Sequence, residues 1–247
     1  YLFGSLITIL PIFKNRVKLF FLTAVIISLL TTLLMAFNNE IIIFILNRFL
    51  AGVSSAFVLI FGTALILPSI QAFGKKSLST SHFMGVGFGI VFSSILISIL
   101  GSLGFIWNEL WIGVSILSLI LAIPIFIYTP NEIILSTPNK ISKSTSTFGF
   151  SLITVSYGLY GFGYVILGTF ISTMARETTG LETTEFYVWF LVGLTGIPMV
   201  IFWPWFGTKI GNDLALFLAC LIMGIGIFMP VIYENNFGII LASILLG

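Results

Sequence analysis

The chain has 247 residues, of which 58% are hydrophobic and only 7% are charged. Soluble domains carry about a quarter of their residues as charges, so the composition excludes a soluble globular protein. The formal net charge of +2 gives no indication of nucleic-acid binding, because the charges lie at the predicted membrane edges and not in one patch, and no nucleic-acid partner is predicted. Most of the chain is therefore predicted to have lipid as its solvent.

Seven continuous apolar stretches are each long enough to cross a bilayer as a helix, which needs about 20 residues. Because they do not alternate apolar with polar residues, transmembrane strands are excluded. Two shorter stretches, 1–13 and 237–247, are predicted to be the cut ends of further spans, so we expect a piece of a longer protein. The sequence thus predicts an all-α polytopic membrane protein with long spans at 19–37, 41–68, 82–106, 110–128, 148–175, 186–206 and 214–233.

Basic residues fall in every second gap between these stretches. The four remaining gaps hold a single basic residue, Arg176. Membrane insertion leaves Lys and Arg preferentially on the cytoplasmic face. We therefore predict that the first, third, fifth and seventh gaps are cytoplasmic, because together they hold Lys14, Arg16, Lys18, Lys75, Lys76, Lys140, Lys143 and Lys209.

The longest gap, residues 129–147, has the composition of a linker, with two Pro, many Ser and Thr, and basic residues. We predict an N-terminal helical bundle over 1–128, a cytoplasmic linker over 129–147 and a C-terminal bundle over 148–247. The segments PIFKNRV at 11–17 and PWFGTKI at 204–210 support a duplication, because both end an apolar run on the predicted cytoplasmic side. Parallel halves joined by a cytoplasmic linker are typical of one large transporter class.

Arg48 is the only formal charge well inside a predicted span, roughly 10 Å along the helix from Ile41. Charges within the membrane mark solute pathways or proton relays. The alternative is a side chain that extends to the outer membrane interface. In a pathway, the positive charge favours an anionic or polar solute, whereas a relay leaves the charge of the solute open.

His82 and a row of tyrosines are the other candidate site residues. The imidazole of His82, at the cytoplasmic edge of its span, titrates near neutral pH and suits proton transfer; the alternative is a solvated interfacial histidine. Tyr157, Tyr160 and Tyr164 are spaced i, i+3, i+7, so they share one face of a helix. This face could line a cavity with rings and hydroxyl donors, or it could pack between helices.

Three segments resemble one family of membrane proteins: NRFLAGVSSA at 47–56, HFMGVGFGI at 82–90 and YGLYGFGYVILGTFIS at 157–172. On these segments the chain is similar to the YbfB/YjiJ-type branch of the major facilitator superfamily, from the second to the tenth of twelve helices. The resemblance implies a two-bundle helical fold and a secondary transporter in a bacterial inner membrane. It further implies alternating access, a small-molecule solute, H⁺ as the coupling ion and a functional Arg48.

The acidic residues argue against catalysis, because all eight Asp and Glu lie in the gaps between spans. A membrane-embedded enzyme acting on lipid would need acids, His or Ser clustered near one interface, and the sequence lacks such a cluster. With one His and one Cys in the chain, neither a metal site nor any other cofactor is predicted. A transport-inactive sensor or partner subunit of the same fold stays open as the alternative function.

Overall fold

Seven helices dominate the structure, a computed structural model that describes all residues except 14–15, 38–39, 73, 75–78, 132–146 and 178–184. Among the described residues these seven are long and apolar enough to cross a membrane, which confirms the predicted all-α polytopic fold. Their bounds are α2 (Val17–Leu34, continued by the 3-10 turn η2, Met35–Phe37), α3 (Ile41–Ala72), α4 (Met84–Ser102, preceded by η4, Ser81–Phe83), α5 (Trp107–Tyr128), α6 (Thr147–Glu177), α7 (Glu185–Ile210) and α8 (Asn212–Ile232).

The two ends of the chain form shorter elements. Residues 237–247 correspond to α9 (Asn236–Leu246), whereas the predicted stretch 1–13 is divided into α1 (Leu2–Ile7) and the 3-10 turn η1 (Pro11–Phe13). Pro11 has no amide hydrogen, and its ring disfavours helical geometry at the preceding residue. The apolar run therefore continues past the point where the helix ends.

Large apolar side chains cover the surfaces of the long helices, as Leu30, Ile120 and Phe228 illustrate. A continuous helix satisfies its own backbone hydrogen bonds, so such a surface is stable in lipid. At 32 residues, α3 is about 48 Å long, which exceeds the roughly 30 Å hydrocarbon core of a bilayer. Part of α3 must therefore tilt in the membrane or project beyond it.

The chain divides into two compact units. Unit 1 comprises the described residues of Tyr1–His82 and Leu96–Ser136, and unit 2 those of Phe83–Ile95 and Thr137–Gly247. The first part of α4 thus belongs to unit 2 and its last part to unit 1. The predicted bundles over 1–128 and 148–247 stay a prediction, and most of the predicted linker lies outside the described residues.

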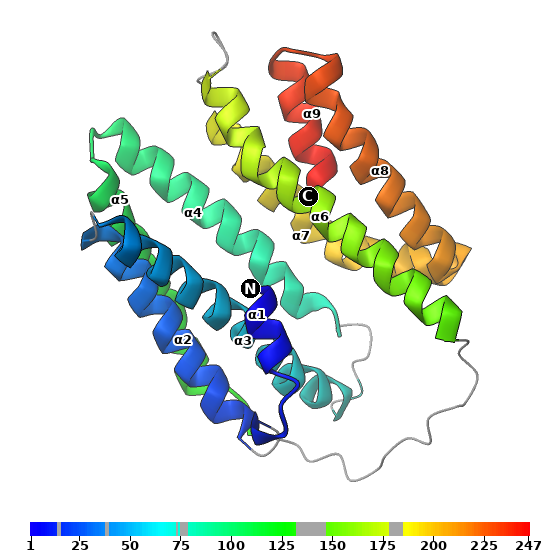
Figure 1. The fold of residues 1–247 in the computed structure, drawn as a ribbon, viewed down its shortest axis with the longest axis horizontal. Helices are drawn as coiled ribbons and strands as arrows, with labels where there is room; N and C mark the ends of the chain where they lie inside the picture. Colours follow the sequence, from blue (N-terminus) through cyan, green and yellow to red (C-terminus); the bar gives the residue numbers. More distant parts are fainter. Residues whose placement is uncertain (14–15, 38–39, 73, 75–78, 132–146, 178–184) are drawn as a thin grey trace. The chain divides into compact units, whose positions relative to one another are not determined.

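Unit 1 is built on α2, which packs against α3 and α5, while α1 packs against α3 (Figure 1). The ring of Phe13 contacts three other aromatic rings of unit 1. Its centroid is 4.6 Å from that of Phe20, 5.4 Å from that of Phe57 and 5.5 Å from that of Phe61. Buried rings contribute large apolar areas to a core. The segment after Pro11 is thereby attached to α2 and α3, in a core made of Phe13, Phe21, Val25, Phe61, Leu65 and Ala122.

One end of unit 1 brings together two gaps that are far apart in sequence. The Nζ atom of Lys18, at the start of α2, donates hydrogen bonds to the carbonyl oxygen of Thr129 and to Oδ1 of Asn131, each 2.9 Å long. Thr129 follows directly after α5. The start of α2 and the first residues after α5 therefore lie at the same end of this unit.

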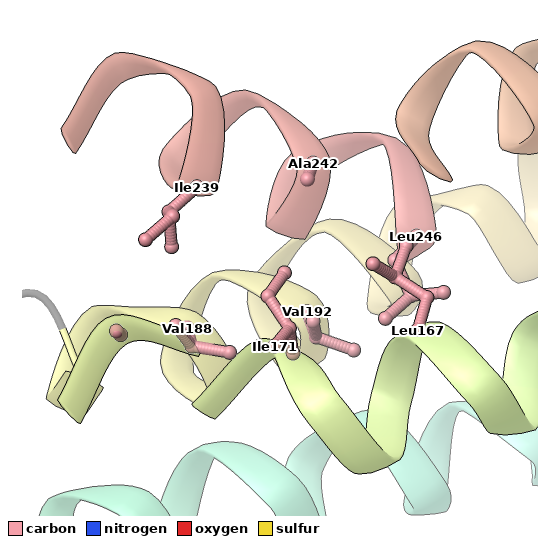
Figure 2. Close-up of a cluster of buried hydrophobic side chains, with 8 residues drawn as sticks. Leu167, Ile171, Val188, Val192, Ile239, Ala242 and Leu246 are labelled. Carbon is pink, nitrogen blue, oxygen red and sulfur yellow. The ribbon is translucent and has the colours of Figure 1, made fainter. Parts of the chain in front are cut away.

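Unit 2 has its core where α6, α7 and α9 meet, and Figure 2 shows the side chains of these helices pointing toward one another. The Oδ1 atom of Asn235 accepts a 3.2 Å hydrogen bond from the backbone N–H of Gly238, which caps the first turn of α9. The adjoining turn is tight, because a Cβ at Gly238 would collide with the carbonyl oxygen of Tyr233. The core residues are Leu167, Ile171, Ala175, Val188, Val192, Ile239, Ala242 and Leu246.

The glycine-rich start of α4 touches α7 within unit 2. A Cβ at Gly87 would lie 2.9 Å from the carbonyl oxygen of Gly193, and a Cβ at Gly193 would lie 2.8 Å from that of Gly87. Neighbouring Gly85 and Gly89 have open space at the same position. Gly87 is therefore the residue of this run that permits the close helix approach typical of membrane proteins.

The two segments proposed to be a repeat differ in local structure. In the first, Pro11 begins the separate turn η1 and Phe13 is buried. In the second, Pro204 lies within the continuous helix α7, and the half-buried ring of Phe206 stacks on Phe202 at 5.3 Å. The two-fold relation between the bundles stays a prediction.

Candidate functional site

Arg48 lies on an exposed face of α3, with its guanidinium close to aromatic rings of two helices. Its Cζ atom is 5.4 Å from the ring centroid of Phe44, one turn earlier on α3, and 5.3 Å from that of Trp111 on α5. Within the described part of the chain, Arg48 makes no ion pair and no hydrogen bond to a protein acceptor. The surrounding protein thus supplies π faces to this cation but no oxygen ligand.

The neighbouring Asn47 fixes the position of Arg48 on α3. Asn47 is buried, and its Nδ2 donates a 2.8 Å hydrogen bond to the carbonyl oxygen of Thr31 near the end of α2. This contact sets the rotation of α3 against α2, which leaves the next residue, Arg48, on the exposed side. Asn47 therefore contributes to the packing of α3 against α2.

Trp111 is held in place by the first turns of α5. The carboxylate of Glu109 accepts a 2.8 Å hydrogen bond from the backbone N–H of Ile106, which stabilises the start of the helix. One turn later Gly113 allows Leu100 of α4 to approach so closely that a Cβ would collide with its side chain. Backbone contacts on both sides of Trp111 thus keep its ring beside Arg48.

The energetics of Arg48 leave room for a further ligand. An arginine at a helix centre costs about 2.5–3.5 kcal/mol on insertion scales. A cation–π contact returns about 0.5–1 kcal/mol at an exposed site and about 2 kcal/mol when it is desolvated. Two such contacts at an exposed site therefore return about 1–2 kcal/mol, which is less than the cost at a helix centre, and an anion or water at the N–H groups would add to this.

Both ring nitrogens of His82, in η4, are within hydrogen-bond distance of an oxygen, and one of these oxygens is on α3. Its Nε2 is 3.2 Å from Oγ1 of Thr63, and its Nδ1 is 3.0 Å from the carbonyl oxygen of Ser79. Because a carbonyl oxygen only accepts, Nδ1 carries a proton in this arrangement. Thr63 also donates a 2.8 Å hydrogen bond to the carbonyl oxygen of Leu59.

The Thr63 hydroxyl couples the protonation of His82 to α3. A protonated ring donates from Nε2 to Thr63, and Thr63 at the same time donates to Leu59. A neutral ring with its proton on Nδ1 accepts at Nε2, and then the single hydroxyl hydrogen of Thr63 must choose between two acceptors. Gain or loss of one proton would therefore change a hydrogen bond on α3.

The tyrosines of α6 differ in their surroundings. Tyr157 is 69% exposed, and its ring stacks on that of Tyr160 with centroids 6.4 Å apart. Tyr164 is half-buried and packs against the core cluster of unit 2. One end of the predicted tyrosine face is thus open, while the other end contributes to packing.

The structure distributes the predicted site residues over separate places. Arg48 and Thr63, the helical contact of His82, are fifteen residues apart on α3, or roughly 22 Å along its axis. They therefore belong to opposite halves of the helix and form two separate sites. The hypothesised contact between Arg48 and the tyrosine face would join unit 1 to unit 2, and it stays a prediction.

Sequence reasoning missed the partners of these residues, Phe44, Trp111 and Thr63. A signal for Phe44 exists, because it precedes Arg48 by four positions and so lies on the same helix face. Trp111 comes from another helix, and no local pattern links it to Arg48. Its position becomes visible only once α5 is packed against α2, which itself packs against α3.

Comparison with protein families gives one match. The family model described as "Uncharacterised MFS-type transporter YbfB" matches residues 1–247. No curated protein and no solved structure matches the chain. A match over all residues, together with the seven helices able to cross a membrane, shows a multi-pass membrane protein that belongs to the YbfB family of major facilitator superfamily transporters.

Proposed function

We propose that this protein is a secondary active transporter that moves a small solute by alternating access in a bacterial inner membrane. Family membership supports a transporter rather than an enzyme. The alternation of basic gaps supports a chain that crosses the membrane repeatedly. In transporters of this architecture, two bundles rock about a central site near the midplane of the bilayer.

Arg48 is the observation that carries the proposal. It is a permanent positive charge within an apolar helix, and the described residues give it aromatic neighbours without a carboxylate. A charge with a purely structural role is expected to have a fixed counter-ion. An arginine without a fixed counter-ion is suited to bind an anionic or polar ligand reversibly.

His82 supports H⁺ as the coupling ion. Its contacts with Thr63 and Ser79 make the hydrogen bonds on α3 depend on the proton content of the ring. An unperturbed imidazole changes charge between about pH 5 and 8, an interval that includes cytoplasmic pH. A proton taken up at His82 would therefore change the hydrogen bonds of Thr63 on α3, the same helix that carries Arg48.

Reconstituted transport tests this function. The protein expressed from its complete reading frame is placed in liposomes that contain a pH-sensitive dye, and carboxylates, sugars and organic cations are added outside. We expect one solute class to cause uptake together with acidification of the lumen, and Arg48→Ala to prevent both. Protein-free liposomes and the Arg48→Ala protein are the controls.

The same assay distinguishes a transporter from the alternative, a sensor or partner subunit. A sensor or partner subunit would bind a solute without carrying it or protons across the membrane. Solute binding by the purified protein with no flux under an imposed proton gradient would therefore contradict the transporter proposal and favour the sensor.

A further inference from the structure

The guanidinium of Arg48 lies over two aromatic rings, and its N–H donors have no acceptor in the described part of the chain. Phe44 and Trp111 lie 5.4 and 5.3 Å from Cζ, and none of the five N–H donors has an acceptor among the residues that the structure describes. We infer that Arg48, Phe44 and Trp111 form a subsite for the carboxylate of an anionic solute, with Trp111 as its positioning residue. This inference rests on the proposed role of Arg48 in solute transport.

The chemistry of the guanidinium selects a carboxylate. Its planar fork of donors matches the two oxygens of a carboxylate in a bidentate pair. Ring faces attract the cation but cannot accept these in-plane hydrogen bonds as an anionic oxygen does. In a medium of low dielectric constant the charge–charge attraction is stronger than in water, so an anion gains more here than at an aqueous surface.

Trp111 gives the subsite a defined geometry, because it contacts Arg48 from a second helix. It reaches Arg48 from α5, a different helix, and its backbone is fixed by the start of α5 and by the close contact of Gly113 with Leu100. The ring restricts the rotamers of Arg48 and so orients its donors. Trp107 lies one turn earlier on the same helix and has no such contact with Arg48, which makes it a matched control.

Binding to matched pairs of acids and amides tests the subsite. The complete protein in detergent is heated with benzoate, lactate, succinate or glutamate, and in parallel with benzamide, lactamide, succinamide or glutamine. A ligand that binds the folded state raises Tm. We expect at least one acid to raise Tm in a saturable way while its amide does not.

The variants assign this binding to the three residues. Arg48→Gln should remove the acid-dependent rise in Tm, whereas Arg48→Lys should keep a weaker one because the charge remains. Trp111→Leu should weaken the apparent affinity roughly 2- to 30-fold, as expected for a lost cation–π contact, and Trp111→Phe should weaken it less. Trp107→Leu should leave the affinity unchanged, and Tm without ligand reports whether each variant is folded.

An anionic lipid headgroup could also occupy the subsite. A second experiment distinguishes lipid from a soluble acid. Tm is measured in nanodiscs of phosphatidylcholine with and without phosphatidylglycerol. A dependence on phosphatidylglycerol that disappears in Arg48→Gln would mean that Arg48 binds a lipid phosphate, and the inference would be wrong. It would also be overturned if every acid behaved as its amide, or if Trp107→Leu weakened binding as much as Trp111→Leu.

The inference and the proposed function fail in different ways. Acid binding through Arg48 without any flux in liposomes would contradict the transporter and leave the subsite intact. Flux of a solute that is unchanged in Arg48→Gln would contradict the subsite and leave the transporter intact.

Discussion

Arg176 and Arg48 both lie on membrane-spanning helices, but one contacts a carboxylate and the other contacts aromatic rings. Arg176, at the end of α6, donates from Nε to both carboxylate oxygens of Glu185 at 3.1 Å, and its Nη2 also contacts Glu185. Arg48, inside α3, has two aromatic rings and no carboxylate within the described structure. The charge of Arg176 thus connects α6 to α7, while that of Arg48 has no counter-ion among the described residues.

Position in the span explains why the two can differ. The side chain of Arg176 is 66% exposed at a helix end, where water can hydrate an ion pair and its net contribution is about 0–1 kcal/mol. Deeper in the span, a fixed ion pair would have to overcome the desolvation of both partners. The pair at α6 is therefore structural, and the arginine without a counter-ion is the better candidate for function.

Removal of the Arg48 charge is the largest expected effect. Arg48→Ala should lower solute uptake by about 30-fold or more, which is typical when one partner of a desolvated charge pair is lost. Expression should persist, because deleting an intramembrane charge favours insertion. Initial uptake rates in liposomes, scaled to the amount of folded protein, measure this. Wild-type uptake by Arg48→Ala would remove the functional distinction between the two arginines.

Arg48→Lys sharpens the same comparison. Lysine keeps the charge but lacks the planar fork and stacks poorly on aromatic rings, so uptake should recover only in part. The apparent KM for the solute is the relevant quantity, because a misoriented cation weakens binding first. Full recovery by lysine would show that Arg48 acts as a simple charge and that the rings do not orient it.

Substitution of His82 should affect proton coupling more than solute binding. His82→Gln keeps a donor and an acceptor near Thr63 and Ser79 but cannot be protonated. Uptake should therefore depend less on internal pH, with little change in KM. Rates measured at a series of internal pH values check this, and an unchanged pH profile would exclude His82 from the coupling step.

The Arg176–Glu185 pair gives the smallest expected effect. Arg176→Gln should lower Tm by less than about 4 °C and leave uptake nearly unchanged, as for an exposed ion pair in a chain of this size. Thermal unfolding and uptake of one preparation measure both. A loss of transport comparable to that of Arg48→Ala would mean that the paired arginine is functional as well.

The sequence predicts the helices well because lipid makes the rule simple. A continuous apolar run must be helical in a bilayer, and all seven long predicted spans correspond to helices that could cross a membrane. The stretch 1–13 is the exception, since hydropathy does not register the missing amide hydrogen of Pro11.

The candidate site was only partly predictable. The charge of Arg48 inside an apolar run is visible in the sequence, as is the imidazole of His82 at the edge of a span. Their partners Trp111 and Thr63 depend on how segments far apart in the chain pack together. That packing follows from tertiary contacts such as Asn47 with the Thr31 carbonyl and Gly113 with Leu100, which no local periodicity encodes.

The central claim is that position 48 faces an aqueous solute path and not lipid. The most direct measurement is the rate at which a membrane-impermeant thiol reagent modifies Arg48→Cys in a cysteine-free background that includes Cys220→Ala. Leu46→Cys is the control, because it points to the other side of α3. The account predicts that the cysteine at position 48 reacts and that the one at position 46 is protected. Protection of position 48 to the same degree as position 46 would contradict the account, because it would mean that position 48 faces lipid.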